Sequence, residues 1–114
     1  MKSNEKERFI RQKANEHIPV GNEKIYWSVH ALKKLRVEGL RKSEVENSLK
    51  ACEIIEDYQV GTRSLPDCLV LGFIGSEPVH SVVAIDIDFD RLLIITIYRP
   101  SAERWKNDWK TRRK

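Results

Sequence analysis

Residues 78–100 (PVHSVVAIDIDFDRLLIITIYRP) constrain the fold of this chain more than any other stretch of the sequence. Two runs of β-branched and other apolar residues, 79–85 and 92–98, flank a short acidic break. β-branched and aromatic residues favour strands, and a pair of such runs around a polar break is typical of an antiparallel hairpin. The sequence therefore predicts neighbouring strands over residues 79–87 and 91–99.

The length of the turn decides which side chains meet across this hairpin. A three-residue turn at 88–90 places His80 directly opposite Tyr98, whereas a two-residue turn would shift the register by one and bring His80 opposite Ile97. Alternate side chains of a strand share a face, so with the three-residue turn His80 and Tyr98 point the same way. The same period predicts one shared face for four side chains of the second strand: Leu92, Ile94, Thr96 and Tyr98.

The sequence before the hairpin predicts helices and two more strands. Ser28 is a favourable N-cap for a helix that ends at Gly39, and its buried stripe is expected to be Ala31, Leu32 and Leu35. The other expected elements are, in chain order, a charged helix over 3–17, an extended lead-in over 22–27, a helix over 40–52, strands over 53–60 and 68–74, and a helix that begins at Ser101 and packs Trp105 and Trp109 on the sheet.

These elements predict an α+β fold. It consists of two or three N-terminal helices, a four-stranded antiparallel β-meander and a C-terminal helix, with helices on one face of the sheet and the other face partly open. A chain of 114 residues has the size of one domain. Residues 1–20 are expected to form a charged N-terminal arm, and residues 21–114 a single α+β domain.

The net charge of +4 is unevenly distributed along the chain. Residues 53–90 contain eight acidic residues and one basic residue, a net charge of −7, so the rest of the chain carries +11. Basic residues gather in 33–42 and in 99–114. A basic flank of this kind fits a nucleic-acid-binding surface, and it equally fits solvated lysine and arginine side chains on a helix surface.

The composition supports neither a metal site nor a membrane span. Cys52 and Cys68 stand alone, without the spacing of zinc ligands, and are expected to be buried thiols. The aspartates of the acidic break lack the glycine and the distal glutamate of a calcium loop. No apolar run approaches the ~20 residues of a membrane helix, and the N-terminus lacks the apolar core of a signal peptide. We therefore expect a cytoplasmic protein without a metal or small-molecule cofactor.

His30 is a candidate base on the helix that follows Ser28. It lies in the first turn, apart from the buried stripe of that helix. The positive end of the helix, together with Lys34 one turn later, disfavours a charged imidazole and leaves a neutral ring that can accept a proton. A surface or capping role is the alternative.

Several short motifs occur in a fixed order along the chain. They are Ser28-x-His30-Ala31, the run EIIEDY from Glu53 to Tyr58, Pro66-x-Cys68-Leu69-Val70-Leu71-Gly72, Pro78-x-His80, Thr96-x-Tyr98-Arg99-Pro100, and Trp105. Over roughly residues 26–112 this series resembles the bacterial family numbered four-two-five-eight among the domains of unknown function. The resemblance implies a relation to RelE-like and MqsR-like ribonuclease toxins and a RelE- or barnase-like build. Arg41 departs from the small polar helix cap associated with the family.

The resemblance implies cleavage of RNA by attack of its own 2′-hydroxyl group, and the residues permit this without a metal. Such a reaction needs a base, an acid and cations around the phosphate. His80 or His30 can act as the base, and Tyr98 or the other histidine as the acid. Thr96 can orient one of these groups. Phosphate binding is expected from four basic side chains: Arg99, Lys34, Arg63 and Arg112.

Two classes of function stay open. The first is a metal-independent endoribonuclease toxin of a bacterial toxin–antitoxin pair, whose partners are single-stranded RNA and a cognate antitoxin protein. The second is a non-catalytic module that binds RNA or a protein through the same surface. In either class we expect a partner on the basic face, because an unshielded basic surface binds RNA indiscriminately at low salt.

Overall fold

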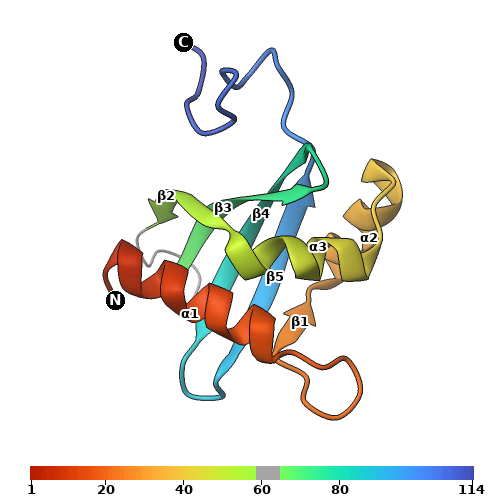
Figure 1. The fold of residues 1–114 in the computed structure, drawn as a ribbon, viewed down its shortest axis with the longest axis vertical. Helices are drawn as coiled ribbons and strands as arrows, with labels where there is room; N and C mark the ends of the chain where they lie inside the picture. The colour runs from red at the N-terminus through yellow and green to blue at the C-terminus, as the bar shows by residue number, and fades with distance from the viewer. Residues whose placement is uncertain (59–64) are drawn as a thin grey trace.

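The computed structural model describes residues 1–58 and 65–114 (Figure 1). The elements are, in chain order, α1 (Ser3–Glu16), β1 (Ile25–Trp27), α2 (Val29–Glu38), α3 (Lys42–Ser48) with a 3-10 turn, η1 (Leu49–Ala51), then β2 (Glu53–Tyr58), β3 (Asp67–Ile74), β4 (Glu77–Asp86) and β5 (Arg91–Tyr98). The α+β class is confirmed, and so is the pairing of the two strands predicted from residues 78–100.

The predicted four-stranded antiparallel meander is wrong. The sheet has five strands in the order β1-β5-β4-β3-β2, and β1 pairs with β5 in parallel. The short β1 is joined to β5 at both of its ends: the Leu92 amide donates to the Lys24 carbonyl at 2.7 Å and the Ser28 amide donates to the Ile94 carbonyl at 3.0 Å. A strand of three residues has too few alternations to reveal a period-two pattern, so the sequence predicted an extended segment without its partner.

The predicted C-terminal helix is also wrong. Residues 101–114, all of which the structure describes, form turns that fold back on themselves beyond the end of β5 (dark blue in Figure 1). The Asp108 carboxylate accepts hydrogen bonds from the amides of Lys110 and Thr111 at 2.9 and 3.0 Å. Such local bonds give the backbone an alternative to helical pairing. Trp109 takes a positive φ of 61°, which a helix does not contain.

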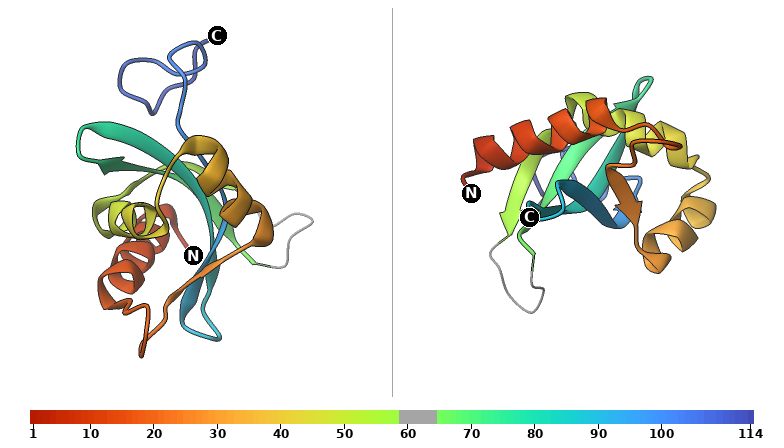
Figure 2. Two further views of the ribbon diagram at one scale, coloured as in Figure 1. Left: turned by 90° about the vertical axis from the view of Figure 1, so that its right-hand side faces the viewer. Right: turned by 90° about the horizontal axis from the view of Figure 1, so that it is seen from below.

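The helices lie mainly on one face of the sheet, where α1 and α3 cover it (Figure 2). The segment expected as a charged arm is α1, and its Ile10 and Ala14 are fully buried in the main core. Side chains of α1 also bind the edge strand: Glu7 accepts from the Ile54 amide at 2.9 Å. Gly72 of β3 allows the end of α3 to pack closely on the sheet, because a Cβ at this position would lie 2.5 Å from the carbonyl oxygen of Ser48, the last residue of α3.

A β-bulge in β5 determines which side chains face the helices. The pair Asp86–Arg91 closes a turn of four residues, not the predicted three. Continued without interruption, that register would bring His80 opposite Ile97. One extra residue in β5, Ile95, shifts the register back, and His80 lies opposite Tyr98 as predicted.

The bulge also overturns the predicted shared face in β5. Leu92 and Ile94 are buried in the core beneath the helices, together with Ile97 beyond the bulge. Thr96 and Tyr98 lie on the opposite face, because the extra residue reverses the alternation between Ile94 and Thr96. A strict two-residue period cannot anticipate this reversal.

Ser28 connects the bulge to α2. Its hydroxyl donates to the carbonyl of Ile95 at 2.8 Å and accepts from the Ala31 amide at 3.0 Å, as expected of an N-cap. The helix ends at Gly39 in the left-handed conformation, which glycine adopts without strain. The start of α2, and with it His30, is therefore held against β5.

We predict that Ser28→Ala lowers the free energy of unfolding by about 1–2 kcal/mol, because the variant loses the helix cap and leaves the bulge carbonyl without its hydroxyl partner. Ser28→Thr keeps the hydroxyl and is expected to lose less than half as much. Urea denaturation of the three proteins measures the difference. Equal stability of Ser28→Ala and wild type would contradict the role of Ser28.

Candidate functional site

His80 lies at the centre of a polar cluster on the face of the sheet opposite α1 and α3. Its side chain is completely buried between Tyr98 and Trp105, with ring centroids 5.1 and 4.4 Å away. Its Nε2 is 2.7 Å from the carbonyl oxygen of Trp109, and its Nδ1 is 3.1 Å from the hydroxyl of Tyr98. A carbonyl oxygen accepts hydrogen bonds and cannot donate them, so Nε2 carries a proton.

The protonation states of the two partners follow from their burial. Burial lowers the pKa of His80 below its ordinary value, so the ring is neutral near pH 7 and its Nδ1 accepts the hydrogen bond from Tyr98. Burial likewise raises the pKa of Tyr98, which keeps its proton. The Tyr98 oxygen thus retains lone pairs that can face a ligand.

A pocket of about 400 Å³ opens beside Tyr98. Its lining comes from the end of β5 and from the C-terminal segment: Tyr98, Arg99, Ser101, Arg104, Trp105 and Arg112. Three arginines, a phenol and a serine hydroxyl give this pocket hydrogen-bond donors suited to a phosphate or another oxyanion. Trp105, predicted to pack on the sheet, lies against His80 and is 2% exposed.

The three arginines differ in how far they are already engaged. Arg112 binds Glu56 through two hydrogen bonds of 2.6 and 2.9 Å, which raise the pKa of Arg112 and lower that of Glu56. Arg99 donates to the Glu38 carbonyl at 2.9 Å and pairs with Glu77. Within residues 1–58 and 65–114, Arg104 has no carboxylate partner. Arg104 is therefore the arginine most available to an anion.

His30 and Thr96 form a second polar pair. The exposed His30 has its Nε2 3.0 Å from the Thr96 hydroxyl. Thr96 and Tyr98 are alternate residues beyond the bulge, so they share a face about 7 Å apart along β5. The two histidine pairs therefore lie along one stretch of the same strand.

The other basic residues that were predicted to bind phosphate are Lys34, Arg99 and Arg63, and the structure does not direct the side chains of the first two to Tyr98. Lys34 pairs with Glu38 at 3.6 Å and does not line the pocket. Arg99 lines the pocket, but its guanidinium is directed to Glu38 and Glu77. Arg63 lies outside the described residues.

Three residues in or next to the pocket were not predicted as site residues from the sequence: Arg104 lines it, whereas Glu56 and Tyr58 lie beside it. Glu56 and Tyr58 are alternate residues of β2, and the Tyr58 hydroxyl donates to Glu56 at 2.9 Å. Their spacing could have indicated a shared face, but the bond from Glu56 to Arg112 spans 56 positions and has no local signal. Arg104 was missed because the sequence predicted a helix over this segment, and in that helix Arg104 would have been an ordinary surface residue.

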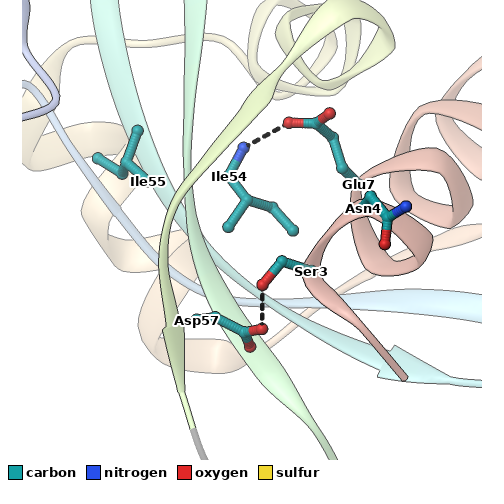
Figure 3. Close-up of a pocket in the computed structure, with 6 residues that line it drawn as sticks. All are labelled: Ser3, Asn4, Glu7, Ile54, Ile55 and Asp57. Atoms are coloured by element: carbon teal, nitrogen blue, oxygen red, sulfur yellow. Dashed lines mark hydrogen bonds between the residues drawn. The ribbon is translucent and has the colours of Figure 1, made fainter.

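A second pocket, of about 350 Å³, lies between α1 and β2 (Figure 3). Its polar groups already bind one another: Glu7 accepts from the Ile54 amide, and Asp57 accepts from Ser3 (Figure 3). The ionisable side chains that line it are carboxylates. Such a lining repels phosphate, so we do not place the functional site here.

The cysteines and the acidic residues offer no further chemistry in the part of the chain that the structure describes. Cys52 and Cys68 are buried free thiols, and burial raises the pKa of each to about 12. They are therefore protonated and unreactive near neutral pH. No cluster of three or more histidine, cysteine, aspartate or glutamate side chains that could hold a metal occurs among the described residues.

Fold and site together define a small α+β protein with a mixed five-stranded sheet. The face opposite α1 and α3 carries a buried histidine paired with a half-buried tyrosine, beside an arginine-lined pocket. Residues 27–99 match the family described as a domain of unknown function, DUF4258, and the chain belongs to this family. No curated protein and no solved structure matches the chain. None of the described helices is both long and apolar enough to cross a membrane.

We predict that His80 makes the protein less stable in mild acid. Because its folded-state pKa lies below its ordinary value of 6.5, the unfolded chain binds the proton more readily than the folded chain. The free energy of unfolding is therefore at its full value above about pH 6.5 and decreases as the pH falls below it.

Denaturant titrations at pH 7.5, 6.5 and 5.5 measure this dependence in wild type and His80→Gln. The other histidines are present in both proteins and cancel in the comparison. Stability should fall more steeply toward pH 5.5 in wild type than in the variant. Parallel curves would show that His80 titrates alike in the folded and unfolded chains.

Proposed function

We propose that this protein is a metal-independent endoribonuclease that cleaves single-stranded RNA in the bacterial cytoplasm, as the toxin of a toxin–antitoxin pair. The observation that carries the proposal is the Tyr98 hydroxyl, held by the neutral His80 at the edge of a pocket lined by three arginines. A proton acceptor and fixed cations around one site are what cleavage by a 2′-hydroxyl requires.

Tyr98 and His80 are suited to work as a proton relay. The Tyr98 oxygen accepts the proton of the attacking 2′-hydroxyl while its own proton passes to Nδ1 of His80. The resulting imidazolium keeps its Nε2 hydrogen bond to the Trp109 carbonyl, which stabilises the positive charge. His80 is buried and acts through Tyr98, so it is a positioning and proton-storing residue and does not contact RNA.

The other groups complete the reaction. The 2′-oxygen attacks the phosphorus, and the bond to the 5′-oxygen breaks, leaving a cyclic phosphate on the upstream fragment. His30, which is exposed and aligned by Thr96, takes the role of the acid in place of the base first expected: as an imidazolium it donates its extra proton to the departing 5′-oxygen and becomes neutral. Arg104 and Arg112 at the pocket stabilise the negative charge of the crowded phosphate.

One observation favours the second function, a non-catalytic module that binds RNA or a protein. His80 has no exposed surface and both of its ring nitrogens are already hydrogen-bonded, as in a structural histidine. In that case the arginine pocket would bind a phosphate group without reacting with it. The two functions differ in whether bound RNA is cut.

We predict that Tyr98→Phe lowers cleavage of a labelled single-stranded RNA by about 100-fold, because the proton relay is broken. Tyr58→Phe is the matched control, since it removes a neighbouring hydroxyl that binds Glu56 and does not line the pocket. It should cleave like wild type. His30→Gln should be impaired to a similar degree as Tyr98→Phe, with circular dichroism confirming that each variant is folded.

The mechanism also fixes the requirements of the reaction. Cleavage should persist in EDTA, release 2′,3′-cyclic phosphate ends, and fail on an RNA whose 2′-hydroxyl groups are methylated. Binding of the methylated RNA should weaken in Arg104→Gln. Binding without any cleavage by wild type would instead support the non-catalytic module. Growth arrest on expression of wild type but not of Tyr98→Phe would support the toxin.

A further inference from the structure

We infer that the outward face of α2 is a docking surface for an acidic amphipathic helix of another protein. This surface consists of Val29, Leu32, Lys33, Arg36 and Val37, which line a hollow of about 440 Å³. In the left view of Figure 2, α2 faces the viewer and no other described helix or strand lies over it. The surface shares no residue with the pocket beside Tyr98.

Three aliphatic side chains are left in solvent on this face. Val29 is 70% exposed, Leu32 is 45% exposed and Val37 is 74% exposed. Leu32 was expected in the buried stripe of the helix, but on α2 the residue that is fully buried is Ala31. Exposed aliphatic residues grouped on one helix face are typical of a surface that a partner covers, and a partner helix fits such a face.

The charges beside these residues indicate the sign of the partner. Lys33 and Arg36 have no ion-pair partner within the described part of the chain, whereas their neighbour Lys34 is paired with Glu38. A helix that presents aliphatic residues to the hollow and carboxylates to Lys33 and Arg36 would bury the valines and pair both cations. The occupant is therefore acidic as well as apolar.

A second copy of the chain and an RNA strand fit this surface less well. Two α2 helices packed face to face would bring Lys33 and Arg36 of each copy against the same cations of the other, which is unfavourable. Single-stranded RNA gains affinity from aromatic side chains on which its bases stack, and this face has none. An acidic helix satisfies both the apolar and the basic residues.

The position of the surface suggests how such a partner would act, and this step rests on the proposed function. Val29 directly precedes His30 at the start of α2. A helix docked on Val29 and Leu32 would lie beside His30 and obstruct the approach of RNA to it. The partner would then inhibit cleavage without entering the arginine pocket.

The docking is tested with a phage-displayed library of 18-residue helical peptides, selected on the whole protein. Selected peptides should share aliphatic residues on one face, flanked by glutamate or aspartate. Fluorescence anisotropy of a leading peptide should show affinity at least 10-fold weaker for Val37→Ser and for Arg36→Glu. Phe89→Ser, which changes an equally exposed residue at the β4–β5 turn, is the control and should bind like wild type.

A charge exchange makes the test specific. A peptide with lysine in place of its critical glutamate should bind Arg36→Glu at least 10-fold better than the parent peptide does. The inference fails if no acidic amphipathic sequence is enriched, or if the enriched peptides bind Val37→Ser as tightly as wild type. It also fails if sedimentation shows a dimer that Val37→Ser dissociates, or if Val37→Ser weakens RNA binding directly.

Peptide binding is measured without RNA and so stands apart from the proposed function. If Tyr98→Phe cleaves RNA like wild type, the proposed chemistry is wrong while the docking surface can still be present. If the peptide binds but does not reduce cleavage by the active protein, the docking is supported and the obstruction of His30 is rejected.

Discussion

The bulge at Ile95 is the constraint on which the geometry of the site depends. Without the extra residue, the four-residue turn would leave His80 opposite Ile97, and Tyr98 would turn toward the core beneath the helices. The bulge also releases a carbonyl that binds Ser28, and through it fixes the start of α2. One irregular residue therefore sets the positions of both histidine pairs, which agrees with the frequent occurrence of bulges next to functional sites.

The burial of His80 is the main energetic feature of the open face. A buried imidazole without partners would cost on the order of 1–3 kcal/mol, and here both nitrogens have one. One of these partners, the Trp109 carbonyl, comes from the C-terminal segment, as does Trp105, which excludes water from the ring. The turn held by Asp108 therefore leaves the Trp109 carbonyl free of helical pairing, and this carbonyl accepts the hydrogen bond from His80.

Local signals in the sequence were sufficient for part of this structure. Ser28 and Gly39 mark the ends of α2 because capping depends on residues that are adjacent in sequence. The hairpin and its His80–Tyr98 pair were predicted as well, although the pair was reached with a turn one residue too short and no bulge. The turn that was too short and the bulge that was missed shift the register by one residue each in opposite directions, so the two errors cancel at His80. They do not cancel at Leu92 and Ile94, which face the core and not the face that carries Tyr98.

The rest depends on contacts that are distant in sequence. The parallel pairing of β1 joins residues more than sixty positions apart, and the Glu56–Arg112 bond joins residues almost as far apart. In the C-terminal segment, the spacing of Trp105 and Trp109 fits a helix, yet the structure has turns, in which Trp105 packs on His80 and Asp108 binds two backbone amides. The spacing of apolar residues does not show whether a segment gains more from helix formation or from such tertiary contacts.

The C-terminal segment lies outside residues 27–99, the part of the chain that matches the family. It is also synthesised after every strand of the sheet. His80 therefore owes its contacts with the Trp105 ring and the Trp109 carbonyl to residues that follow the last strand, and the pocket owes Arg104 and Arg112 to the same segment. A protein that shares only residues 27–99 with this chain can therefore share its sheet and its His80–Tyr98 pair without sharing the lining of the pocket.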